Sequence, residues 1–322
     1  MSETAVHSAS LDAVETVMRD ELAQNAVTAA SIVPIMRHLL TSDGSSIFSD
    51  DVVARVRGML ADVTRQLLDA QLAGGAEGER ADHPEELCAE LGEALVGNAA
   101  FLFHLHALAL EWQLADRLQA RMGLDPVLTP LLQALIASPE PAVAELAMNL
   151  LAAQARFCQS QRRMQLPLGE LPGDLLHAAL VAMRAIAGTE PERDARAAAA
   201  EAAIRASYDE GRNRLGMLAR IVTGLGGGAV AALSLTHAGV AIFLSALSIG
   251  SSQDRDTTAL ATNEAQLARF ALALRASGRK PEAVDEQFVM LHPEIALPPG
   301  FDRLGADRAA ALLAVSGSYA GG

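Results

Sequence analysis

Apolar residues recur every three or four positions along almost the entire chain, and this spacing constrains the fold more than any other feature. An α-helix turns about once every 3.6 residues, so this spacing gathers apolar side chains into a stripe that must be buried. Between residues 49 and 70 the stripe consists of Val52, Val56, Met59, Leu60, Val63 and Leu67. The charged residues Arg55, Asp62, Arg65 and Asp69 fall on other faces. The pattern predicts amphipathic helices and an all-α protein.

Composition favours close packing between these helices. Apolar residues make up 51% of the chain and aromatic residues only 3%, so small and aliphatic side chains dominate. Segments that combine Val, Ile, Thr and Tyr, as strands do, are scarce. We therefore expect helices that approach one another closely through alanine and leucine.

Charge and cysteine content bear on partners and compartment. The formal net charge is −14, which on average repels a phosphate backbone, so no nucleic-acid binding is expected. Cys88 and Cys158 form no close motif, as is usual in a reducing compartment. The first fifteen residues lack the basic and apolar regions of a secretion signal. The sequence predicts a cytoplasmic protein.

A polar, glycine-rich stretch at residues 73–86 is the clearest linker. Pro84 suits the first position of the helix that follows. The sequence therefore predicts two parts, an N-terminal helical region over residues 1–78 and a longer helical body over residues 84–322.

Two places are expected to interrupt long helices. A helix from about Leu11, with Val14, Val17 and Met18 on its apolar face, should be kinked or restarted by Pro34. The stretch after Pro84 forms either one long helix or two helices broken near Gly97 and Asn98.

Two segments predict pairs of helices joined by short proline-containing turns. In the first, a helix with Leu131 and Leu135 precedes the turn SPEP, and a second helix follows from Pro141. The same arrangement returns around Pro191, 50 residues later. Helices joined by so short a loop should lie antiparallel. The interval is close to the period of about 40–47 residues in HEAT and armadillo arrays.

The segment PLLQALIASPEPAVAELAMNLL resembles a HEAT repeat, and TEPERDARAAAAEAA resembles a second copy. HEAT repeats usually carry Asp in the turn and Arg early in the second helix. The first copy has Glu145 in that region, whereas the second keeps Arg193 and Arg196. The resemblance implies an α-solenoid or an irregular helical bundle.

Two further segments, RRMQLPLGELPGDLLHAAL and DTTALATNEAQLARFALALRASG, resemble an uncharacterised bacterial family of HEAT-like domains of unknown function. Together the resemblances cover residues 128–292. The family implies the helical fold and brings no catalytic residues.

The stretch VTGLGGGAVAALS, from Val222 to Ser234, fits the short form of a dinucleotide-binding fingerprint. That fingerprint must follow a buried strand and open a helix. The residues before it instead repeat at helical spacing, with Leu215, Leu218 and Ile221 on one face. A tight turn between helices at Gly226–Gly228 is therefore expected, and no nucleotide cofactor.

Residues 221–253 contain no Asp, Glu, Lys or Arg. The run exceeds the roughly 20 residues that span a bilayer, but glycines, His237 and several Ser and Thr divide it into shorter pieces. A helix buried on all sides has the same composition. We expect a buried helix after the glycine turn, with membrane contact as the alternative.

The C-terminal part predicts three short helices. Asn263 should cap the first, with Gln266 as its capping partner and Gly278 as its stop. Pro281 opens the second, and the last covers Ala306–Val315.

The candidate binding residues are Arg162, Arg163, His104 and Trp112. The adjacent arginines form a candidate patch for an anion or a partner, and Trp112 is a candidate interface anchor. His104 and His106, two apart on a helix, point about 200° from each other and cannot easily share a metal ion. One histidine is therefore expected in the core and the other at an interface or on the surface. No catalytic residue, metal ligand or cofactor is predicted.

These features predict a non-catalytic scaffold, adaptor or regulator that binds another protein through an acidic helical surface. Two alternatives stay open. One is a helical ligand-binding protein or enzyme with a pocket near residues 224–250, and the other is a membrane-associated regulator that uses residues 221–253. A homo-oligomer is compatible with all three.

Overall fold

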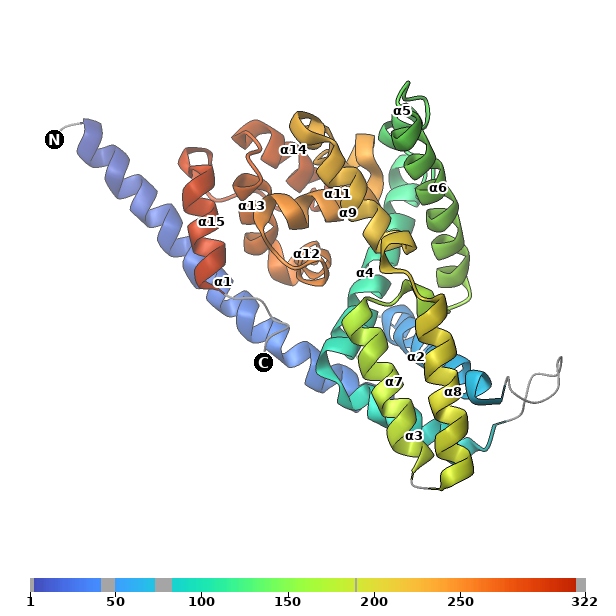
Figure 1. The fold of residues 1–322 in the computed structure, drawn as a ribbon. Coiled ribbons are helices and arrows are strands. Elements are labelled where there is room, and N and C mark those ends of the chain that lie inside the picture. Colours follow the sequence, from blue (N-terminus) through green and yellow to red (C-terminus); the bar gives the residue numbers. More distant parts are fainter. Residues whose placement is uncertain (1–2, 42–49, 73–82, 189, 317–322) are drawn as a thin grey trace. The chain divides into compact units, whose positions relative to one another are not determined.

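The computed structural model of the protein describes residues 3–41, 50–72, 83–188 and 190–316 (Figure 1). Across these residues there are fifteen α-helices and no strands, which confirms the all-α prediction. The expected boundary between residues 78 and 84 falls largely on residues 73–82, which lie outside the described part. The division into two sequence regions therefore stays a prediction.

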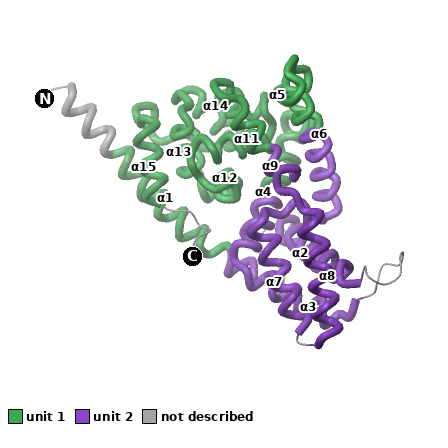
Figure 2. The backbone as a smooth tube through the Cα atoms, viewed as in Figure 1, with its two compact units in different colours: residues 1–32, 110–148, 218–322 green, residues 33–109, 149–217 purple. Residues whose placement is uncertain are grey.

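The chain forms two compact units, each assembled from separate stretches of sequence (Figure 2). Unit 1 contains residues 1–32, 110–148 and 218–322, and unit 2 contains residues 33–109 and 149–217.

In unit 2, four helices form a closed ring of contacts. They are α2 (Asp50–Leu72), α3 (Glu85–Gly97), α7 (Gly173–Ala187) and α8 (Pro191–Ser207). Two of them, α2 and α7, also contact each other across the ring. The whole predicted apolar face of α2, from Val52 to Leu67, is buried. The helix pair predicted around Pro191 is present as α7 and α8. Its two members are also joined by an ion pair of 2.6 Å between Arg184 and Asp194.

In unit 1, the helix α11 (Leu235–Ser251) contacts four shorter helices. They are α5 (Pro130–Ile136), α10 (Ala229–Ala232), α12 (Arg255–Ala261) and α13 (Leu267–Ala276). Residues 238–247 of α11 are all buried, as expected for a helix without charged residues. The predicted glycine turn is an exposed 3₁₀ turn at Gly226–Gly228, which follows α9 (Arg214–Gly224). The uncharged stretch is thus an exposed turn followed by a core helix.

A buried ion pair lies beside α11. Arg255, at the start of α12, donates to both carboxylate oxygens of Glu111 at 2.9 and 3.1 Å, and to Oγ of Ser245 at 3.0 Å. Glu111 belongs to α4 (Ala99–Met122) and is buried. A bidentate pair of this kind satisfies both charges inside the core.

The remaining expected helices are present, and the structure corrects two expectations about the first helix of the chain. The helix α1 (Glu3–Thr41) runs through Pro34 as one element, and Val17 is exposed whereas Val14, Met18 and Leu22 are buried. The break near Gly97 is confirmed, because Asn98 separates α3 from α4 and its Oδ1 accepts from the backbone N–H of Phe101 at 3.0 Å. The helices α6 (Pro141–Arg162), α14 (Pro281–Leu291) and α15 (Ala306–Val315) begin at or next to the expected residues.

Gly239 allows α5 to approach α11 closely. Its φ of 70° is left-handed, and an added Cβ would lie 2.3 Å from Cγ2 of Thr129, the N-cap residue of α5. We predict that Gly239→Ala lowers the free energy of unfolding by about 3 kcal/mol or more, through backbone strain and overpacking together. Gly278 is the matched control, since its φ is 82° but an added Cβ would meet no atom within 4 Å. Gly278→Ala should lower the free energy of unfolding, measured with urea, by only about 1–2 kcal/mol. Equal losses would contradict the close contact.

His292 is buried against the rings of Phe288 and Phe270, at centroid distances of 5.7 and 6.4 Å. Burial lowers the pKa of His292, and the nearby guanidiniums of Arg117 and Arg121 lower it further, against the opposing effects of Glu264 and the backbone of Thr262. The folded state therefore binds a proton less readily than the unfolded state.

We predict that the free energy of unfolding falls as the pH drops below about 6.5, because the unfolded chain then takes up a proton that folded His292 does not. His292→Gln should reduce this acid-dependent loss in urea unfolding measured between about pH 8 and pH 5. An unchanged slope in the variant would exclude His292 as its source.

Candidate functional site

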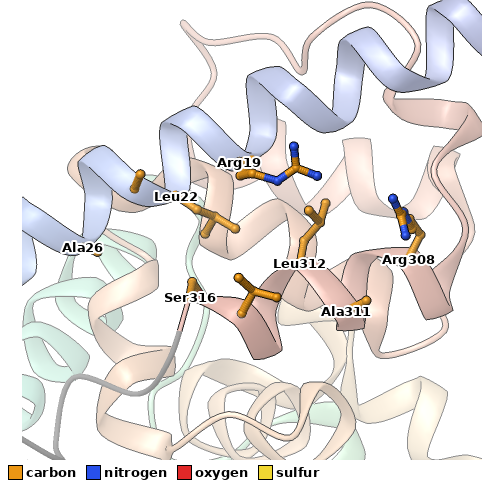
Figure 3. Close-up of a pocket in the computed structure, with 9 residues that line it drawn as sticks. Arg19, Leu22, Ala26, Arg308, Ala311, Leu312 and Ser316 are labelled. Atoms are coloured by element: carbon orange, nitrogen blue, oxygen red, sulfur yellow. The ribbon is translucent and has the colours of Figure 1, made fainter.

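A groove of about 450 Å³ lies between α1 and α15 in unit 1 (Figure 3). Its walls are two helical stripes with spacings of three and four residues. The first consists of Arg19, Leu22, Ala23 and Ala26, and the second of Arg308, Ala311, Leu312, Val315 and Ser316. Because small alanines separate the larger side chains, each stripe leaves hollows between its ridges.

The two stripes are only partly covered. Leu22 and Leu312 are 2% and 7% exposed and form the floor, whereas Val315 is 84% exposed. The opposite face of α15 packs against α13 and buries Ala309 and Leu313. The groove therefore presents apolar surface that the described residues of unit 1 leave open.

A reciprocal pair of hydrogen bonds holds α1 in register. The side-chain amide of Asn25 donates to the carbonyl of Ala265, and that of Gln266 donates to the carbonyl of Asn25, both at 2.8 Å. This corrects the expected capping box, since Gln266 faces α1 and Asn263 caps only the 3₁₀ turn Glu264–Gln266. The contact fixes one wall of the groove.

The charges of the groove are concentrated towards one end. Arg308 lies opposite the end formed by Ala26 and Ser316, and Arg19 lies between them (Figure 3). Arg308 donates to both oxygens of Glu15 at 2.6 Å. These hydrogen bonds hold the pKa of Glu15 below its ordinary value, although burial acts in the opposite direction. Among the described side chains of the groove, two guanidiniums thus face one carboxylate, and their balance is positive.

This arrangement favours binding over covalent chemistry. Apolar floors accept aliphatic side chains, and guanidiniums pair with carboxylates through charge-assisted hydrogen bonds. Within the described ranges, no group of three or more His, Cys, Asp and Glu side chains could hold a metal ion.

The residues singled out from the sequence lie elsewhere. His104 and Trp112 are 1% and 7% exposed, so both are core residues and neither is available as a partner contact, and His106 is buried as well. Arg162 and Arg163 are exposed at the end of α6, where Arg163 lines a second, smaller hollow in unit 2 and Arg162 does not.

Sequence reasoning missed the groove for a physical reason. Each wall has the spacing of any amphipathic helix, and nothing local marks Arg19 or Arg308 as special. The only clue was the short stripe of small residues near each arginine. Tertiary contact alone brings together two stripes that lie almost a full chain length apart.

Two alternatives from the sequence were a pocket near residues 224–250 and membrane contact through residues 221–253. Neither hollow described here is lined by residues 224–250. No single helix in the described part of the chain is both long and apolar enough to cross a membrane. Three pairs of consecutive helices are long and apolar enough when each pair is taken together, but every pair is sharply bent. They are α3 with α4, bent by 90°, α9 with residues 226–232, bent by 104°, and α11 with α12, bent by 111°.

No known protein family, curated protein or solved structure matches the chain. The resemblance of residues 128–292 to HEAT repeats therefore stays a prediction. The finding is the coarser one of an all-α fold that includes the packed helix pair α7 and α8.

The register of α1 can be tested by a double-mutant cycle. We predict that Asn25→Ala and Gln266→Ala each lower the free energy of unfolding by about 1 kcal/mol, because each removes one hydrogen bond between α1 and residues 265 and 266. Their effects should be coupled by at least about 0.5 kcal/mol in urea unfolding. Strict additivity would show that the two amides do not act as a pair.

Proposed function

We propose that the protein is a non-catalytic interaction protein that binds a helix of another protein in the groove between α1 and α15. The observation that carries this proposal is the open apolar groove, whose two walls repeat every three and four residues. An amphipathic helix repeats its side chains at the same spacing, so its ridges fit the hollows of both walls.

Size and exposure support a helix as the occupant. A volume of about 450 Å³ lies within the usual range of about 300–1,000 Å³ for binding pockets, and accommodates several side chains from one helical face. Val315 at the rim would lose its exposure when a third helix lies across the groove. Burial of aliphatic side chains would supply most of the affinity.

Charge complementarity indicates that the occupant is acidic. Among the described side chains of the groove, Arg19 and Arg308 outweigh Glu15, whereas the whole chain has a net charge of −14. An acidic helix would be attracted to this rim and repelled by much of the remaining surface. We therefore propose an amphipathic partner helix with an acidic residue towards one end, and a role as scaffold, adaptor or regulator in the cytoplasm.

The first test identifies the occupant. A photo-crosslinking residue is placed at Ala311, inside the groove, or at the neighbouring exposed Ala310, outside it, in cells of the source organism. We expect crosslinks to a helical segment of one protein from position 311 and not from position 310. Crosslinks to lipid, to a second copy of the chain, or equally from both positions would contradict the proposal.

The second test uses the crosslinked segment as a purified peptide. Isothermal titration should give one site per chain, and Ala311→Arg should weaken binding by at least about tenfold because it fills the groove. Ala310→Arg is the matched control and should change the affinity by less than about twofold. Arg19→Gln should weaken binding and reduce its salt dependence, since it removes one charge pair. If Ala311→Arg left the affinity for the peptide unchanged, the proposal would be overturned.

A further inference from the structure

The C-terminal end of α6 carries a second hollow, of about 230 Å³, which lies wholly within unit 2. Its walls combine basic, amide and apolar side chains from three consecutive stretches. They are Arg156, Phe157, Gln159 and Ser160 of α6, Arg163, Gln165, Leu166 and Pro167 of the following turn, and Glu170 of the 3₁₀ turn Leu168–Glu170.

Two arginines at the rim are available to a ligand. Arg156 and Arg163 are exposed, and neither makes an ion pair or side-chain hydrogen bond with a described residue. Both line the same hollow, so they lie on the same side of the helix end. Arg162, directly beside Arg163, does not line the hollow.

A third guanidinium lies below the aromatic floor. Arg214 is 1% exposed and covers the ring of Phe157, with its Cζ 3.6 Å from the ring centroid. Its Nη1 donates to Oε1 of Gln154 at 3.3 Å. One oxygen of Glu170 accepts from the backbone N–H of Arg214 at 3.0 Å, so part of the only carboxylate in the lining is already occupied. The balance around the hollow is positive.

The rim is held by a close contact with α2. An added Cβ at Gly58 would lie 2.5 Å from Cβ of Met164, whose own φ is 54°. Asp62 accepts from the backbone N–H of Leu166 at 3.1 Å, and Gln66 donates to the carbonyl of Leu166 at 2.8 Å. These bonds fix the turn that carries Arg163.

The same contact explains why two charged residues of α2 are buried although they lie outside its apolar stripe. Arg55 donates to the carbonyl of Gln161, and Asp62 accepts from the backbone N–H of Leu166, so both charged groups bind neighbouring backbone. A turn held this firmly loses little conformational entropy when a ligand binds.

We infer that this hollow binds a phosphomonoester group. Guanidiniums match the tetrahedral oxygens of phosphate through parallel hydrogen bonds, and Ser160 and Gln159 offer further polar groups. The volume is below the roughly 300 Å³ of a drug-sized pocket, which suits a single head group of a small soluble ligand. The inference does not depend on the groove in unit 1.

The test uses inorganic phosphate and the full-length chain. Isothermal titration in about 0.15 M chloride should give saturable binding at one site per chain. Arg156→Gln and Arg163→Gln should each weaken it by about tenfold, the loss expected for one charge-assisted hydrogen bond. Arg162→Gln is the matched control, equal in charge change and adjacent in sequence, and should alter the affinity by less than about twofold.

Separate arms distinguish the sources of phosphate. Glycerol phosphate and O-phosphoserine should bind at least as well as inorganic phosphate and compete with it, whereas vesicles of phosphatidic acid should not. The inference is overturned if phosphate and both monoesters fail to bind. It is equally overturned if Arg162→Gln weakens binding as much as Arg163→Gln does, or if only the vesicles bind, because both results indicate adsorption to surface charge.

Discussion

Unit 1 depends on covering a helix that has no charged side chain. Every face of α11 must be removed from water, so α5, α10, α12 and α13 all pack against it. A helix this apolar would otherwise aggregate or enter a membrane. At Gly239 the absence of a side chain allows α5 to pack closely against α11. At Arg255 an ion pair neutralises the buried carboxylate of Glu111. The groove walls then form on elements attached around this core.

Unit 2 is held differently, through polar side chains that bind backbone. Arg55, Asp62 and Gln66 of α2 each contact a carbonyl or N–H between residues 161 and 168. A segment without regular secondary structure needs such partners, because its backbone groups cannot pair along a helix. The ring of four helices supplies the apolar core, and α2 also orders the turn beside it.

The sequence predicted the helices well because their periodicity is local. The apolar face of α2, the start of α14, the buried α11 and the bounds of α15 all follow from spacing, glycine and proline, whereas the break at Asn98 was one of two alternatives. Side-chain contacts between residues far apart in the sequence could not be predicted. Nothing near Asn25 indicates that its amide donates to the carbonyl of Ala265 or that its own carbonyl accepts from Gln266, and nothing near Arg55 indicates that it donates to the carbonyl of Gln161. Of the four candidate binding residues, Arg163 lines the hollow of unit 2, whereas His104 and Trp112 are buried, because packing decides which residues of an apolar helix reach the surface.

The pair of Glu15 and Arg308 has a consequence for selectivity. Glu15 is almost completely buried, so a visiting carboxylate that took over Arg308 would strand a charge in the interior, at a cost greater than a surface ion pair returns. Arg19 also lies near Glu15, and its charge lowers the pKa of that carboxyl, but among the described side chains it donates no hydrogen bond to it. The groove should therefore choose between acidic helices by where a single carboxylate falls along their length. Total acidity would matter little, and two partners of equal charge could differ widely in affinity.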